Sequence, residues 1–205
     1  EVNNTMLLMA KQGAEKVYIS LNVHWNALEA FAGTEEIKEW YKDWDRASSA
    51  IDKEITRSGS FNITVADVYG NPRSPIETEG SLIESAFFQR ALRGEKSISD
   101  PFVTSDDNLC VIYAVPIKEN GNVTGVLLSQ RDATEITAVT NGITYGKTGN
   151  ALMINSKGDN VAHNVIDNVR NKDNIIENYK KDPELKELAE IQQKMINKES
   201  GFGEY

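Results

Sequence analysis

Hydrophobic residues recur at helical spacing along the first part of the chain. Between positions 5 and 32, apolar side chains return every seven residues, at Leu7, Ala14, Leu21 and Leu28, and further apolar residues widen this stripe. The pattern predicts an amphipathic helix of about 38 Å. A second stripe, from residue 34 to residue 57, predicts another helix that ends at Gly59.

Strand patterns follow these helices. Phe61, Ile63 and Val65 alternate with polar or small residues, which predicts a strand before a turn at residues 69–72. Two apolar runs, 109–117 and 123–130, flank Asn120-Gly121, the sequence signal of a two-residue hairpin turn. Because neither run alternates cleanly, we expect both strands to be central and covered on both faces.

The turn predicts a register for this hairpin. A two-residue turn pairs Lys118 with Val123, and continued pairing then places Tyr113 opposite Leu128. One face of the hairpin would carry Val111, Tyr113, Val115, Val126, Leu128, Gln130 and Asp132. Because this apolar face ends in an amide and a carboxylate, we predict that it forms the floor of a pocket.

The remaining segments mix short helices with short strands. Capping boxes at residues 81–84 and 132–135 predict two helices, and Asp182-Pro183 predicts the start of a third. Short strands are expected at 151–155 and 161–163, joined by a turn. Long N-terminal helices followed by antiparallel strands and short helices predict the α+β class.

Composition narrows the possible partners. The 205 residues carry a net charge of −9 without a Lys/Arg-rich run, which argues against nucleic-acid binding. No run approaches 18 uninterrupted apolar residues, so we predict no membrane span within the sequence. Glu1 already has the character of a helix interior, and we therefore expect the chain to be an excised part of a longer protein.

The sequence offers no pattern of residues that supports catalysis or cofactor binding. Residues 146–148 (Gly-Lys-Thr) would need a glycine at position 141 to form a P-loop, and the chain has Asn141 there. His24 lies on the apolar stripe of the first predicted helix and His163 ends a predicted strand, so the two histidines do not indicate a zinc site. We predict a protein that is not an enzyme and that uses no cofactor or metal.

A series of short motifs in a fixed order resembles a known sensor family. After the two long helices come ADVYG, AFFQRALRG, SDPF, YAVPI, GNVTGVLLSQRD and GKTGNALMINSKGDNVAH. In this order they resemble the double Cache family, the extracytoplasmic ligand-binding regions of bacterial and archaeal chemoreceptors, sensor kinases and diguanylate cyclases. The resemblance implies a long helical region at 1–58, a membrane-distal PAS-like module at 59–145 and an incomplete membrane-proximal module at 146–205.

The resemblance also implies ligand-binding positions. In the amino-acid-binding branch of the family, an arginine, a tryptophan and a tyrosine on the helical segment hold the ligand carboxylate, and these positions are Ser85, Phe87 and Phe88 here. The tyrosine of the SDPF-like motif is Phe102, whereas the aspartate that binds the ligand ammonium is retained as Asp132. Because serine cannot form the bidentate contact of an arginine, we do not expect an ordinary α-amino acid as ligand.

A pocket with aromatic walls and one carboxylate favours a cationic amine, a purine or a pyrimidine. The predicted ligand-binding residues are Asp132, Gln130, Tyr113, Val111, Phe102, Phe87, Ser85 and Asp100. Alternatives remain for three positions: Phe87 and Phe88 could belong to the plain core of the module, and Asp132 could be a helix cap.

The resemblance implies small-molecule sensing at the extracytoplasmic face of the cell membrane. We expect a chemoreceptor sensor domain that is membrane-anchored in the full-length protein and forms a weak homodimer through its N-terminal helix. The sensor region of a histidine kinase or diguanylate cyclase is one alternative. A structural or protein-interaction module with no small ligand is another.

Overall fold

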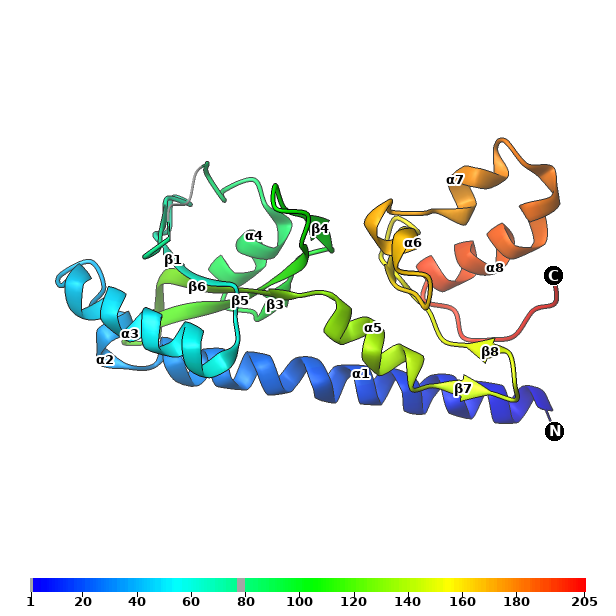
Figure 1. The fold of residues 1–205 in the computed structure, drawn as a ribbon, viewed down its shortest axis with the longest axis horizontal. Helices are drawn as coiled ribbons and strands as arrows, with labels where there is room; N and C mark the ends of the chain where they lie inside the picture. The colour runs from blue at the N-terminus through cyan, green and yellow to red at the C-terminus, as the bar shows by residue number, and fades with distance from the viewer. Residues whose placement is uncertain (1, 77–79) are drawn as a thin grey trace. The chain divides into compact units, whose positions relative to one another are not determined.

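The computed structural model describes residues 2–76 and 80–205, which form two compact units (Figure 1). The sheet unit consists of Leu21–Asp100 and Thr104–Asp132. The terminal unit consists of the residues up to Ser20, Pro101–Val103 and Ala133–Tyr205. Each unit has its own helices and strands.

Three helices precede the sheet. α1 spans Val2–Ala32 and contributes residues to both units. The second predicted helix forms as two, α2 (Glu35–Lys38) and α3 (Trp44–Ser58), because the chain turns between them. Gly59 ends α3 in the left-handed conformation, at φ 69°, which confirms the predicted helix end.

The sheet unit contains an antiparallel sheet with the strand order β2-β1-β6-β5-β3. Its strands are β1 (Asn62–Ala66), β2 (Pro72–Arg73), β3 (Ser97–Ile98), β5 (Leu109–Glu119) and β6 (Asn122–Asp132). The predicted hairpin is confirmed, since β5 and β6 pair on either side of Asn120-Gly121. Both turn residues have positive φ angles, 51° and 83°, as the favoured two-residue turn requires.

A bulge changes the register of this hairpin. Lys118 pairs with Val123 as predicted, but Ile117 pairs with Gly125, so that Thr124 is an extra residue in β6. Beyond this point every pairing is shifted by one residue, and Tyr113 lies opposite Ser129 instead of Leu128. The predicted register is therefore wrong past Ile117. A one-residue shift moves side chains to the other face, so the predicted pocket face combined residues from both sides of the sheet.

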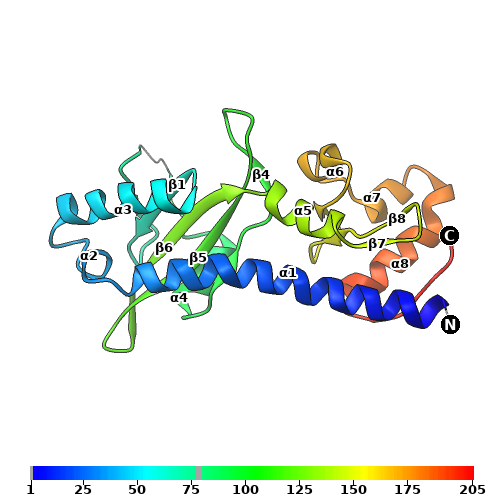
Figure 2. The ribbon, with the colours of Figure 1, turned by 60° about the horizontal axis from the view of Figure 1, so that its bottom comes forward.

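Different helices cover the two faces of the sheet. On the α4 face, Phe88 and Ala91 of α4 (Ala86–Leu92) are fully buried against Ala66, Ala114, Val126 and Leu128. On the α1 face, the Tyr113 ring packs against His24 and Trp25, with ring centroids 5.2 and 5.9 Å apart. Figure 1 shows α4 above the strands and α1 below them, and Figure 2 brings the α1 side forward. The sheet is thus covered on both faces, as its apolar strands predicted.

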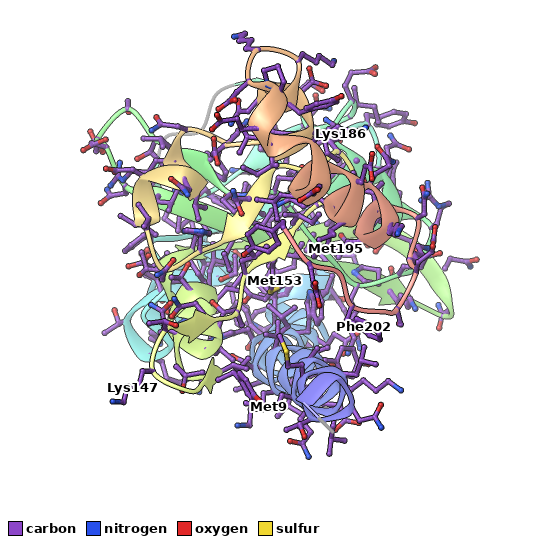
Figure 3. The ribbon with its side chains drawn as sticks, turned by 90° about the vertical axis from the view of Figure 1, so that its right-hand side faces the viewer. Met9, Lys147, Met153, Lys186, Met195 and Phe202 are labelled. Atoms are coloured by element: carbon purple, nitrogen blue, oxygen red, sulfur yellow. The ribbon has the colours of Figure 1, made fainter. Side chains whose placement is uncertain are left out.

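The terminal unit is built from short elements. Its strands are β4 (Phe102–Val103), β7 (Thr144–Tyr145), β8 (Gly149–Asn150), β9 (Met153–Ile154) and β10 (Asn160–Ala162). Its helices after α1 are α5 (Thr134–Asn141), α6 (Ile166–Arg170), α7 (Ile175–Tyr179), a 3-10 turn (Pro183–Leu185) and α8 (Lys186–Ile196). The predicted cap at Asp182 is confirmed, because its carboxylate accepts a hydrogen bond from the Glu184 amide (3.1 Å). Met195 of α8 and Phe202, both labelled in Figure 3, are exposed by 41% and 65%.

The two predicted capping boxes do not form as expected. α4 begins at Ala86 with Ser85 in the N-cap position, several residues after the predicted start. α5 begins at Thr134 and has Ala133, not Asp132, in the N-cap position. The overall combination of helices and antiparallel sheet is α+β, as predicted. Among the described residues, no helix has both the length and the apolar character needed to cross a membrane.

Candidate functional site

A pocket of about 190 Å³ opens on the α4 face of the sheet. It is lined by side chains from four strands and from the loop before α4: Asn62, Thr64, Pro72, Leu82, Ile112, Leu128 and Gln130. The antiparallel register explains this grouping. Gln130 pairs with Asn62 on one side and with Ile112 on the other, and Thr64 pairs with Leu128. Because paired residues point to the same face, these rows form the floor of the pocket.

The polar groups of the pocket are the side-chain amides of Asn62 and Gln130 and the hydroxyl of Thr64. The Gln130 Nε2 donates a hydrogen bond to Cys110 Sγ (3.3 Å), and the Asn62 Oδ1 accepts one from Ser74 Oγ (2.6 Å). These contacts orient both amides. An amide has two donor hydrogens and a carbonyl oxygen, so each can also contact a ligand. Together with the aliphatic side chains, they suit a small molecule with polar and apolar parts.

The cysteine beside the pocket, Cys110, has an unreactive thiol. Cys110 is fully buried, and burial raises the pKa of its thiol. A protonated thiol is neither a nucleophile nor a metal ligand, so Cys110 acts here as a small apolar side chain that accepts a hydrogen bond from Gln130. Within residues 2–76 and 80–205, no three His, Cys, Asp or Glu side chains are grouped to hold a metal ion.

The structure brings one of the predicted site residues, Gln130, into the lining of the pocket and places a second, Asp132, on the same face of β6. Asp132 lies two positions beyond Gln130 and pairs with Cys110. Tyr113 and Val111 are 2% and 1% exposed on the opposite, α1 face, so their predicted position beside Leu128 is wrong. The bulge at Thr124 is the physical reason, because it reverses the facing of β5 relative to β6.

The other predicted residues lie in different environments. Phe87 is partly buried and packs against the apolar core of the α4 face, whereas Ser85 is the N-cap residue of α4. Asp100 is exposed in the segment after β3, and Phe102 lies in β4, which groups with the terminal unit. The core alternative is confirmed for Phe88, which is fully buried. Ligand contacts of Phe87, Ser85, Asp100 and Phe102 stay predictions.

Most of the pocket lining was missed by the sequence analysis. Asn62, Thr64, Pro72, Leu82 and Ile112 were assigned no role there, although all five reach the pocket. A signal was present in β1, where polar Asn62 and Thr64 alternate with buried Ile63 and Val65. Polar residues on the second face of a strand that is covered on both sides are typical of a binding surface within the fold.

Comparison with known proteins gives structural neighbours. No protein-family model and no curated protein matches the sequence. The ligand-binding domain of the Pseudomonas fluorescens chemoreceptor CtaA, in complex with L-serine, is similar in fold, with 14% identity over 88% of this chain and 79% of that one and a TM-score of 0.69. The corresponding domains of Pseudomonas aeruginosa PAO1 PctB with L-Arg (15% identity, 82% and 73% coverage, TM-score 0.65) and PctC with GABA (14%, 87% and 82%, 0.62) are similar as well. The chain therefore has the fold of chemoreceptor ligand-binding domains.

These neighbours correct the predicted ligand class. The ligands in their complexes are amino acids: L-serine, L-Arg and GABA. The prediction that disfavoured an ordinary α-amino acid, in favour of an amine, a purine or a pyrimidine, is contradicted by this finding. That prediction depended on Ser85 alone, because serine replaces the arginine that would hold a ligand carboxylate. The pocket in this chain offers other hydrogen-bond donors, the side-chain amides of Asn62 and Gln130.

Proposed function

We propose that this chain is the extracytoplasmic sensor domain of a membrane-anchored chemoreceptor, with a double Cache architecture. The pocket on the α4 face carries the proposal, because it lies in a fold shared with chemoreceptor ligand-binding domains. At about 190 Å³ it is smaller than the pockets that hold drug-sized molecules, which favours a ligand with few heavy atoms. We infer that the domain binds its ligand without transforming it.

The ligand is an amino acid or a closely related zwitterion. In this proposal the amide N–H groups of Asn62 and Gln130 bind the ligand carboxylate, and the carboxylate of Asp132 binds its ammonium group. Ile112 and Leu128 contact the ligand side chain. The support is the register of the sheet, which places all five residues on one face of neighbouring strands.

A ligand in this position can transmit a signal if it binds two conformations of the receptor with different affinity. The pocket floor is made by the same strands that support the core of the α4 face. Leu128 belongs both to the pocket lining and to the core beneath α4, so a ligand that contacts it can change the packing of α4 on the sheet. Such a change, and not chemistry on the ligand, is what a receptor passes on to its output module.

A thermal-shift screen tests this proposal. The panel should contain the common amino acids, GABA, small amines, purines and pyrimidines. At 100 times its Kd, a ligand stabilises the folded state by about 2.7 kcal/mol. We expect an amino acid to raise the Tm. A rise with amines or nucleobases alone would reject the amino-acid class, and a panel without any hit would favour a protein-interaction module instead of a sensor.

A further inference from the structure

A second pocket, the α1–β7 pocket, has a volume of about 220 Å³ and lies in the terminal unit between α1 and the β7–β8 hairpin. Figure 1 shows β7 and β8 beside the first turns of α1. Nine residues line the pocket, among them Met6, Met9 and Ala10 of α1 and Ile143, Tyr145 and Asn150 of the segment 143–151. None of the nine lines the α4-face pocket, so the two pockets are separate.

A close contact between α1 and the hairpin segment positions this pocket. Gly13 is buried, and a Cβ at this position would lie 2.9 Å from the Cδ1 atom of Ile143, so a larger residue would push the two segments apart. Met6, Met9 and Ala10 precede Gly13 by seven, four and three residues and therefore lie on the same face of α1. The helix face that meets Ile143 thus continues as the α1 wall of the pocket.

The lining of the α1–β7 pocket is mostly apolar and carries no charge. Met6 is 46% exposed and Tyr145 is 38% exposed, whereas Met9 and Ile143 are half-buried. Apolar side chains that line a concave, open surface are typical of a binding site. Because an ion would lose hydration here without meeting an opposite charge, the lining favours a neutral molecule.

The side chains of the pocket favour an aromatic ring. Met6 and Met9 offer flexible thioether groups, whose sulfur atoms make favourable contacts with aromatic rings, and the Tyr145 ring offers a further aromatic surface. The Asn150 Nδ2 donates a hydrogen bond to the Thr148 carbonyl oxygen (3.0 Å), which orients this amide. The Asn150 carbonyl oxygen and the Tyr145 hydroxyl can each bind one polar atom of a ligand.

The size of the pocket favours a small molecule over a protein partner. An apolar cavity of about 150 Å³ is large enough to hold benzene, so about 220 Å³ can hold a molecule of one or two rings. Each side of a stable protein–protein interface has about 20–30 residues, and only nine line this pocket.

We propose that the α1–β7 pocket is a second ligand site, which binds a neutral aromatic molecule with one polar group, such as indole or benzyl alcohol. The ring contacts the sulfur atoms of Met6 and Met9 and the ring of Tyr145. The polar group of the ligand bonds with the Tyr145 hydroxyl or the Asn150 amide. This site goes beyond the proposed amino-acid sensing and does not depend on it.

The methionines provide a local probe of this site. The chain has four, and Met6 and Met9 line the pocket whereas Met195, labelled in Figure 3, belongs to α8 and does not. The protein is labelled with ¹³C at the methionine methyl groups, and each NMR signal is assigned by a single Met→Leu variant. Titration with indole should shift the signals of Met6 and Met9 in a saturable way, because the field of an aromatic ring acts at short range. The signal of Met195 should stay in place.

Two tryptophan variants of α1 test the location. Ala10→Trp places a large side chain at the pocket wall and should raise the Kd for indole at least tenfold. Ala30→Trp is the matched control, because Ala30 is also an exposed residue of α1 but lies 20 residues, or about 30 Å, further along the helix. Its Kd for indole should equal that of the wild type.

Three related compounds test the ligand class. Benzyl alcohol should bind at least tenfold more tightly than benzoate, which carries a charge, and more tightly than cyclohexylmethanol, which has no aromatic ring. Equal binding of benzoate or of cyclohexylmethanol would overturn the assignment to a neutral aromatic ligand.

Three other outcomes would overturn the site itself. The first is the absence of saturable shifts of Met6 and Met9 with both indole and benzyl alcohol. The second is an equal shift of Met195, which would indicate unspecific partition of the ring compounds. The third is a Kd for indole that Ala10→Trp leaves unchanged. Amino-acid binding is measured separately in the same proteins by isothermal titration, so failure of this site is distinguishable from failure of the sensor function.

Discussion

Replacement of Gln130 by leucine should separate ligand recognition from folding. The Gln130 side chain lines the α4-face pocket and donates to Cys110 Sγ at 3.3 Å. Thiol sulfur is a weak acceptor, so little stability depends on this bond. Leucine has a similar size and adds no polar atom that could be left unpaired. We therefore expect the free energy of unfolding to change by less than about 1 kcal/mol.

Ligand affinity should respond much more strongly to the same substitution. If the Gln130 amide donates to the carboxylate of a bound amino acid, Gln130→Leu removes a hydrogen bond to a charged group. Such bonds contribute about 1.5–3 kcal/mol. The Kd should therefore rise about 13- to 160-fold. Isothermal titration of the wild type and the variant with the tightest-binding amino acid measures this ratio, and urea denaturation measures the stability.

Ser129→Ala is the control for this experiment. Ser129 is the neighbour of Gln130 in β6 but faces α1, where its hydroxyl lies 2.8 Å from that of Ser60. Its loss should cost about 1 kcal/mol of stability and leave the Kd for the amino acid within about twofold of the wild type. A wild-type Kd in Gln130→Leu, or an equal loss of affinity in Ser129→Ala, would refute the assignment of the pocket to the α4 face.

Three further predictions concern stability and reactivity. Phe88→Ala removes a fully buried ring from the core of the α4 face and should lower the free energy of unfolding in urea by about 3–5 kcal/mol; an unchanged midpoint would contradict this core. Burial alone would raise the pKa of Asp67, but hydrogen bonds from Asn71 and the amide of Tyr69 lower it overall from 3.8. The stabilisation that ionised Asp67 gives to the folded state is therefore fully present above pH 3.8 and is lost as the pH falls through the lowered pKa of this carboxyl group. Melting at a series of pH values should show Asp67→Ala to be less acid-sensitive than the wild type. Cys110 is fully buried and burial raises its thiol pKa, so a thiol reagent at pH 8 should modify it after unfolding and not before; rapid labelling of the native protein would be inconsistent with its burial.

Much of the fold follows from local sequence signals. The heptad-like stripe before Gly33 predicts α1, and Asn120-Gly121 predicts the β5–β6 hairpin, because both depend on neighbouring residues in the chain. The break between α2 and α3 was not predicted, since the apolar stripe continues through it. The predicted start of α4, at residue 81, is too early. Ser81 accepts a hydrogen bond from the Ile83 amide (3.3 Å), but this bond closes a turn and not the first turn of a helix.

The pocket was harder to predict than the strands that form it. A bulge at Thr124 reverses the facing of β5 relative to β6, and its position depends on packing between strands that are distant in sequence. One signal was available in Gly125, because glycine inside a strand often marks a bulge or a close backbone approach. A Cβ at Gly125 would lie 2.7 Å from the Ala66 carbonyl oxygen of β1. The residues that β1 and the loop before α4 bring to the pocket could not be grouped without this strand order.

A crystal structure of the chain with its tightest-binding amino acid tests the central claim most directly. We expect ligand density in the α4-face pocket, with the ligand carboxylate about 2.7–3.2 Å from the amide nitrogens of Asn62 and Gln130. Density for the amino acid at another position, with the α4-face pocket filled by protein side chains, would contradict it.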